Sequence, residues 1–232
     1  MISTTSTARI KNTRELILDI AWHGYSCFRI TERGHTSVVT DPFGPKKTLA
    51  KMRLNADLVT VSHNRERHQV ADIRDQKYVI AGPGEYEVGE LFVTGIALHH
   101  HDVEKDAVSD NVAYHFEYPN GLNVLHLGAL HQLPDPSIFE RLDQVNVLLL
   151  PVEDALLAGN QLADLISVIE PNYVVPMQPI QSRDADFSTA VDGFLKLMGA
   201  SSVEAQAGLR LTSTSLPEQT QVSLLRSNHR SN

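Results

Sequence analysis

The chain has 232 residues, of which 42% are hydrophobic and 21% charged, a composition typical of a globular protein with one substantial core. The formal net charge of -8 disfavours non-specific binding to nucleic acid, which requires a basic surface. No stretch reaches the roughly 20 apolar residues that a membrane span needs, and residues 1–13 lack the apolar segment of a secretory signal. The sequence therefore predicts a cytoplasmic protein that binds neither nucleic acid nor a membrane.

The sequence contains a single cysteine, Cys27, which excludes an intrachain disulfide and fits a reducing compartment. Its neighbours Tyr25, Phe28 and Ile30 are apolar or aromatic. We therefore expect Cys27 to behave as a small buried hydrophobic residue.

The first half of the chain is rich in short strands. Alternating or continuous apolar residues, many of them β-branched, are separated by turns that contain glycine, such as Gly24 and Gly34. Asn120-Gly121 is a strong hairpin signal, residues 82–84 (GPG) predict a turn, and the polar tract 99–110 predicts a loop. Strands are predicted at residues 16–20, 27–31, 37–40, 57–62, 78–81, 91–98, 112–118 and 122–127.

The second half alternates strands with helices. Residues 145–152 are almost wholly apolar, as in a central buried strand, and strands also follow at 173–177 and 222–225. Apolar residues at helical spacing predict amphipathic helices at 161–169 and 187–198, the second ended by Gly199. This order predicts an α/β fold of two mixed sheets with helices outside. We expect one domain, 14–226, with flexible tails at 1–13 and 227–232.

Histidines and other polar residues follow three of the predicted strands. These segments are 62–68 (SHNRERH), 126–131 (HLGALH) and 176–179 (PMQP). Loops at strand ends converge on one site in many folds. We therefore expect a functional site where these three segments meet.

These segments resemble motifs of the metallo-β-lactamase superfamily, together with residues 21–28 (AWHGYSCF), 40–43 (TDPF) and 82–86 (GPGEY). The most similar branch contains the ascorbate-6-phosphate lactonase-like hydrolases, and the landmarks occur in the same order from about residue 18 to 225. The resemblance implies a four-layer αββα sandwich that carries a two-metal hydrolytic site. In such a site, histidines and aspartates of the loops hold the metals, and one aspartate bridges them.

Most of the expected metal ligands are replaced in this chain. His63 and His68 match family histidines, and the resemblance suggests His101 as a third, so these three are vestigial metal-ligand candidates. The other positions of the predicted pocket carry different residues. Arg65 stands for a histidine, Arg67 for an aspartate, Ala129 for the bridging aspartate, Gln178 for the last histidine and Tyr25 for the histidine of Gly-His-Ser, while Asp41 is kept near the site.

These replacements are unfavourable for zinc. A catalytic zinc needs about three protein ligands and an open position. Arg65 and Arg67 cannot ligate, because a guanidinium group stays protonated and has no lone pair to offer. The sequence therefore predicts a decayed metal site without a cofactor, in a non-catalytic protein that binds a ligand or partner.

Several alternatives remain open from the residues alone. A rebuilt site could hold zinc or manganese and retain hydrolase activity, and a structural subunit or homo-oligomer is a further reading. Arg65 and Arg67 could replace the metal charges, bind a small anion or face solvent. Residues 99–101 (HHH) could be solvated, His126 is expected to be buried and bonded to backbone, and Asp41 is expected to start a turn. Candidate ligands of a rebuilt site are His23, Glu66, His131, Glu153 and Asp154.

Overall fold

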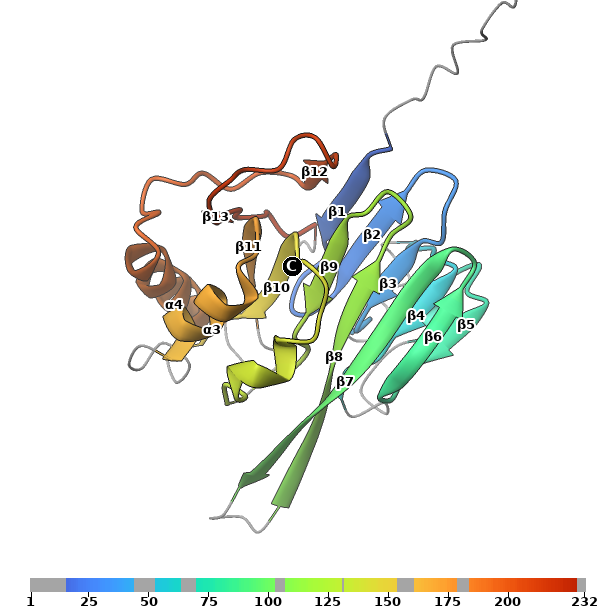
Figure 1. The fold of residues 1–232 in the computed structure, drawn as a ribbon, viewed down its shortest axis with the longest axis horizontal. Coiled ribbons are helices and arrows are strands. Elements are labelled where there is room, and N and C mark those ends of the chain that lie inside the picture. Colours follow the sequence, from blue (N-terminus) through green and yellow to red (C-terminus); the bar gives the residue numbers. More distant parts are fainter. Residues whose placement is uncertain are drawn as a thin grey trace, which may run out of the picture.

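The computed structural model describes residues 16–43, 53–63, 70–102, 107–130, 132–153, 161–178 and 184–228, with the side chains at 99–102 and 107–110 left out. Two sheets pack face to face (Figure 1). The first sheet contains β1 (Leu18–Trp22), β2 (Phe28–Glu32), β3 (Val38–Thr40), β4 (Leu58–Thr60), β5 (Tyr78–Ile80) and β12 (Leu209–Leu211). The second contains β6 (Gly84–Val88), β7 (Leu91–Asp102), β8 (Ala107–Glu117), β9 (Asn123–His126), β10 (Val147–Pro151), β11 (Tyr173–Met177) and β13 (Gln221–Val222).

Both sheets are mixed, as the sequence predicts. The strand order is β12-β1-β2-β3-β4-β5 in the first sheet and β13-β11-β10-β9-β8-β7-β6 in the second. The pairs β3–β4, β4–β5, β9–β10, β10–β11 and β11–β13 are parallel, and the remaining pairs are antiparallel. The alternation of buried and half-buried residues along β1 and β2 places one face of the first sheet against the second.

The interior between the sheets is apolar and draws residues from both. It includes Ile20, Phe28, Tyr114, Phe116 and Leu149, each fully buried. A second cluster lies on the outer face of the second sheet, beneath the helices, and a third lies on the outer face of the first sheet. Cys27 belongs to the third cluster and is fully buried, which confirms the prediction, and burial raises the pKa of its thiol.

Two helices cover part of the second sheet (Figure 1). Helix α3 (Gln161–Ile169) has the predicted bounds, whereas α4 (Asp184–Leu197) begins three residues before the predicted start. Asp184 and Asp186 occupy the first turn of α4, where a negative charge is favourable near the helix N-terminus. Gly199 adopts a φ of 64° after the last turn, consistent with its predicted role in ending the helix. Two short 3-10 helices, η2 (Val70–Asp72) and η3 (Pro136–Phe139), complete the described elements.

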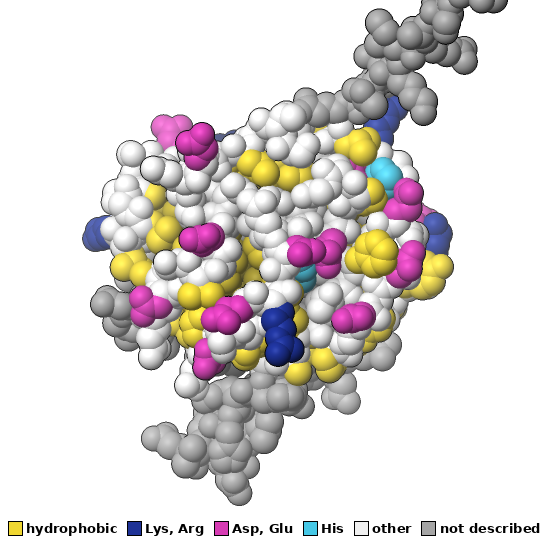
Figure 2. Space-filling model, in the orientation of Figure 1, with side chains coloured by type: hydrophobic (Ala, Val, Ile, Leu, Met, Phe, Trp, Pro, Cys, Tyr) yellow, Lys and Arg dark blue, Asp and Glu magenta, His cyan; other side chains and the backbone are white. Residues whose placement is uncertain are grey.

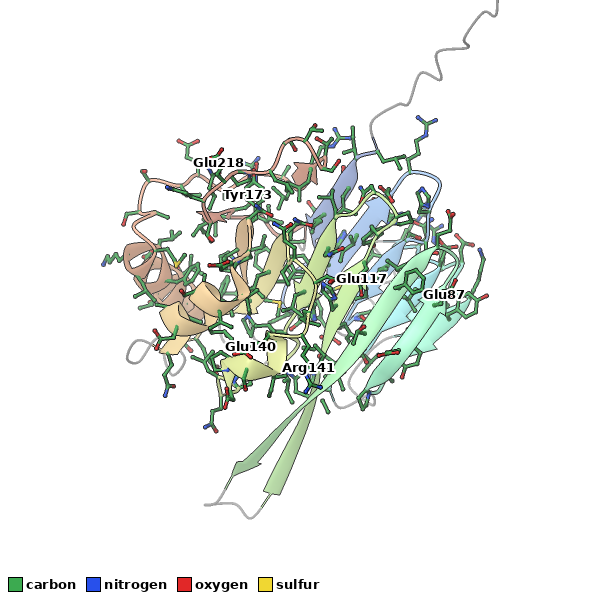
Figure 3. All side chains as sticks on the ribbon, viewed as in Figure 1. Glu87, Glu117, Glu140, Arg141, Tyr173 and Glu218 are labelled. Carbon is green, nitrogen blue, oxygen red and sulfur yellow. The ribbon has the colours of Figure 1, made fainter. Side chains whose placement is uncertain are left out.

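On the outer face of the second sheet, α3 and α4 lie on the side of β10 and β11, away from the β6 edge (Figure 1). Phe92 on β7 is 52% exposed there and pairs with Glu87 on one side and Glu117 on the other (Figure 3). Acidic side chains are more frequent than basic ones on this face of the molecule (Figure 2). In the described residues, no helix is long and apolar enough to cross a membrane.

The prediction of a loop at residues 99–110 is wrong. Strand β7 continues to Asp102 and β8 starts at Ala107, so that His99 pairs with Asp110 and His101 with Val108. This hairpin extends beyond the body of the sheet (Figure 1). A hairpin without a core to face tolerates a polar sequence, because its backbone pairing does not depend on apolar side chains.

Three other strands differ from the prediction. Gly84 starts β6, which the sequence pattern missed because Glu85 and Glu87 make this edge strand polar. β12 was also missed, and β13 is Gln221–Val222 in place of the predicted 222–225. Both are short edge strands, whose pairing depends on neighbouring strands more than on their own composition.

Candidate functional site

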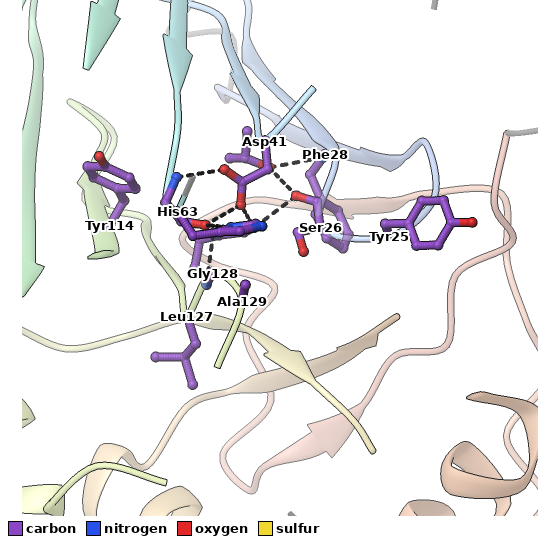
Figure 4. A network of polar contacts seen from close by, with 12 residues as sticks. Tyr25, Ser26, Phe28, Asp41, His63, Tyr114, Leu127, Gly128 and Ala129 are labelled. Atoms are coloured by element: carbon purple, nitrogen blue, oxygen red, sulfur yellow. Dashed lines mark hydrogen bonds and ion pairs between the residues drawn. The ribbon is translucent and has the colours of Figure 1, made fainter. Parts of the chain in front are cut away.

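The candidate site lies where residues that follow β3, β4 and β9 meet between the two sheets. Asp41 follows β3, Ser62 and His63 follow β4, and Ala129 follows β9. Figure 4 shows these residues converging with Ser26 of the loop between β1 and β2. The sequence placed its three polar segments at one site, and the structure brings together the described parts of the first two, at Ser62 and Gly128.

Asp41 organises the first part of the site. It is buried, with 2% exposure, and its φ of 39° lies in the left-handed region, which aspartate tolerates better than most residues. Its Oδ1 accepts the Ser62 N–H at 2.7 Å, and its Oδ2 accepts the Ser62 hydroxyl at 2.6 Å. Asp41 is therefore an acceptor that joins two strand ends, a larger role than the predicted turn.

The same network orients His63. The Ser62 hydroxyl gives its one proton to Asp41, so its oxygen must accept from Nδ1 of His63, 2.9 Å away. In the neutral ring this tautomer places the lone pair on Nε2, the form in which histidine binds a metal. The chain Asp41–Ser62–His63 thus keeps one histidine in a ligand-competent tautomer.

His126 serves the scaffold. It is fully buried, its Nδ1 accepts the Gly128 N–H at 3.2 Å, and its Nε2 lies 2.9 Å from the Ser26 carbonyl. Since a carbonyl only accepts, Nε2 carries the proton. The expected buried histidine bonded to backbone is confirmed. Its Nε2 is also 4.0 Å from Asp41 Oδ2.

Asn111 on β8 joins the loop after β9 to the rest of the site. Its Oδ1 accepts the Ala129 N–H at 3.0 Å, and its Nδ2 donates to the Leu127 carbonyl at 2.8 Å. The next amide, that of Val112, donates to the Ser62 carbonyl at 2.8 Å. Gly128 lies between them with a φ of 66°. The loop that follows β9 is therefore held by buried hydrogen bonds on both sides.

Two further residues of the predicted pocket, Tyr25 and Gln178, have described side chains. Tyr25 has a φ of 48°, packs edge-on against Phe43 and points away from His63 (Figure 4). Gln178, 7% exposed, follows β11, and its Nε2 donates to Asp184 Oδ1 at 3.1 Å.

The other expected ligands lie outside the described residues or lack a described side chain. His101 lacks a described side chain. The residues outside the described part of the chain are Arg65, Glu66, Arg67, His68, His131 and Asp154. In the described part of the chain, no three His, Cys, Asp or Glu side chains are arranged to hold a metal ion. His23 is buried, with a pKa lowered to about 4 by burial and by Arg29, and its two ring nitrogens have no hydrogen-bond partner among the described residues.

Three residues of this network were not identified from the sequence: Ser26, Ser62 and Asn111. Ser62 directly precedes the recognised His63, so its position was the available signal. Asn111 lies at the edge of a tract predicted to be a loop, and no local pattern distinguishes it. Its partners are 16 and 18 residues away, a relation that only the fold provides.

Replacing Asp41 with alanine should lower the free energy of unfolding by about 2–4 kcal/mol, because a buried amide and a buried hydroxyl of Ser62 lose their acceptor. Urea unfolding followed by circular dichroism measures the loss. Asp41→Asn is the matched control, since it keeps one acceptor oxygen and tolerates the positive φ, and it should cost about 1 kcal/mol. Equal losses for the two variants would contradict the role assigned to the carboxylate.

Comparison with known proteins places this geometry in context. The domain family described as "Beta-lactamase superfamily domain" matches residues 19–178. A search of curated proteins finds no match. Among solved structures, a proposed Zn-dependent hydrolase of the metallo-β-lactamase superfamily from Thermotoga maritima is similar, with 26% identity and a TM-score of 0.68, over 90% of this chain and 98% of that one.

Two further structures share the fold at lower identity. One is Igni18, a metallo hydrolase from Ignicoccus hospitalis, at 16% identity and a TM-score of 0.58, over 84% of this chain and 98% of that one. The other is an isothiocyanate hydrolase from Delia radicum gut bacteria, at 11% identity with the same TM-score and coverage.

Proposed function

Because this chain belongs to the β-lactamase superfamily, whose domain spans residues 19–178 here, we propose that it is a member with a decayed metal site that binds a ligand or partner without hydrolysing it. Within the superfamily we place it nearest the ascorbate-6-phosphate lactonase-like branch, on its ordered sequence landmarks. We place its action in the cytoplasm, in line with the single buried cysteine.

The observation that carries the proposal is Ala129. The step around it is intact, since Gly128 keeps its positive φ and the Ala129 N–H is bonded to Asn111. At the position where the family carries a bridging carboxylate, the side chain is a methyl group that offers no ligand atom. The backbone around this metal-ligand position is thus retained, and the metal-binding carboxylate is replaced.

The other donors do not fit a zinc centre either. His63 has a suitable tautomer, but Gln178 offers a neutral amide whose nitrogen is bonded to Asp184. Arg65 and Arg67 replace two ligands of the same loop with cations. By the family pattern, one metal would keep at most His63 and His101 and the other only His68, fewer than the three protein ligands that a catalytic zinc requires. We therefore derive no hydrolytic step through a metal.

The ligand class that we propose is a small anion. Two guanidinium groups next to His63 in the sequence provide charge and paired donors for a carboxylate or phosphate. The net charge of -8 is unfavourable for nucleic acid, which we exclude from the proposed partners along with membranes. Self-association remains compatible with this proposal.

Metal content tests the proposal directly. Protein purified without a metal-affinity tag, dialysed against zinc and then desalted, should contain close to zero metal per chain by plasma mass spectrometry, because too few ligands remain. The same measurement after dialysis against manganese tests for binding of a harder metal ion. About one or two metals per chain, retained through desalting, would overturn the decayed-site proposal and favour a hydrolase with a rebuilt site.

A further inference from the structure

A buried acid lies at the end of β2, away from the candidate site. Glu32 is the last residue of the strand and continues the inward-facing row of Phe28 and Ile30. Its side chain has 0% exposure, and neither carboxylate oxygen accepts a hydrogen bond within the described chain. A carboxylate in this position is costly unless a cation or a proton neutralises it.

Two neighbouring groups face this carboxyl. His35, in the turn after β2, places Nε2 3.9 Å from Glu32 Oε2. Tyr118, 3% exposed, has a hydroxyl without a hydrogen bond among the described residues, and burial together with Glu32 raises its pKa. Burial raises the pKa of Glu32 above its ordinary value of 4.5, His35 opposes this shift, and Glu90 adds to it.

His35 also reaches the second sheet. Its Nδ1 lies 3.1 Å from Oε2 of Glu90, in the turn between β6 and β7. A hydrogen bond from the Thr36 hydroxyl to the Val88 carbonyl, 2.7 Å long, joins the same two turns. Glu90 is 74% exposed, so water screens its attraction to His35.

We propose that Glu32, His35 and Glu90 form a pH-dependent clasp between the two sheets. When His35 is protonated, the imidazolium lies between a buried carboxylate of the first sheet and an exposed carboxylate of the second. When Glu32 ionises at higher pH, its buried charge is balanced within the clasp only by this group, whose Nε2 is 3.9 Å away. This end of the sandwich then opens more readily, while the hydrogen-bonded network around Asp41 is unaffected.

The sign of the pH dependence follows from the charges. The pKa of Glu32 is raised in the folded protein, so its ionisation there costs stability that is absent below pH 4.5 and grows as pH rises through the folded value. The contribution of Glu32 to stability should therefore fall as pH rises above 4.5. The buried His23 and His115, whose pKa values are lowered to about 4, give the opposite trend up to about pH 6.5.

The test is urea unfolding between pH 5 and 8 of the wild type, Glu32→Gln, His35→Gln and the exposed control Glu85→Gln. Glu85→Gln should follow the wild-type midpoint at every pH. The advantage of Glu32→Gln over the wild type should grow as pH rises, up to about tenfold in the unfolding constant for each pKa unit that burial adds. His35→Gln should fall further below the wild type as Glu32 ionises, because it removes the group that opposes the raised pKa of Glu32.

A local measurement separates a clasp from a uniform change in stability. Amide hydrogen exchange of residues 88–91, corrected for intrinsic rates, should accelerate between pH 5.5 and 8 in the wild type but not in Glu32→Gln. The Val112 amide, bonded to Ser62 at the candidate site, should show no such change. A wild-type pH profile in Glu32→Gln, or equal acceleration at Val112, would overturn the proposal. If Glu32→Gln fails to fold, a deficit of His35→Gln relative to the wild type that grows as pH rises provides a second test.

Discussion

Gly128→Ala should lower the free energy of unfolding by about 3–5 kcal/mol, the sum expected for an overpacked core, a positive φ and broken buried hydrogen bonds. A Cβ at this position would lie 2.3 Å from Asn111 Oδ1 and 2.6 Å from the Ser62 Cβ. Both neighbours are held in place, Asn111 by the loop after β9 and Ser62 by Asp41. The clash therefore cannot be relieved by a free side chain, and the site must come apart.

Gly121→Ala is the matched control for this prediction. Gly121 also has a positive φ, 79°, but a Cβ there would meet nothing within 4 Å. Its replacement should cost about 1 kcal/mol, from backbone strain alone. Urea unfolding monitored by circular dichroism compares the two variants. If Gly128→Ala is no less stable than Gly121→Ala, the close approach of the two loops at Gly128 is not a constraint.

Four substitutions together should create a metal site in this chain. Arg65→His, Arg67→Asp, Ala129→Asp and Gln178→His restore the donors that the family resemblance implies, and His63, His68 and His101 supply the rest. We expect zinc content to rise from near zero to about two per chain, because each metal then has three or more protein ligands. Plasma mass spectrometry after zinc loading and desalting measures the gain.

Two variants make this result interpretable. Ala129→Asp alone should stay close to zero, since Arg65, Arg67 and Gln178 still replace three other ligands. Adding His63→Ala to the four substitutions should reduce the zinc content, as it removes the histidine that Ser62 orients. Zinc uptake by the single variant would mean that this chain contains further ligands, whereas failure of a folded quadruple variant would place the obstacle in the scaffold.

Periodicity and motif order determined the overall plan of this protein. The apolar run that became β10 and the helical spacing of α3 specify their elements locally, because a buried strand and an amphipathic helix have distinct patterns. The motif around His63 pointed to the superfamily, and the resemblance implies that Ala129 stands where the family has a carboxylate. Chemistry that depends on residue identity is thus available from sequence.

Only the tertiary structure decided which strands pair and which distant side chains meet. Pairing with neighbouring strands holds the edge strands β6 and β12 and the hairpin of β7 and β8 in place. The sequences of these strands do not indicate which strands they pair with. The same holds for Asn111, whose partners lie 16 and 18 residues away, and for Glu32, whose burial beside Tyr118 contradicts the usual exposure of glutamate. A hydrogen bond or an ion pair between distant residues is a property of the packed sheets, so composition and spacing along the chain cannot reveal it.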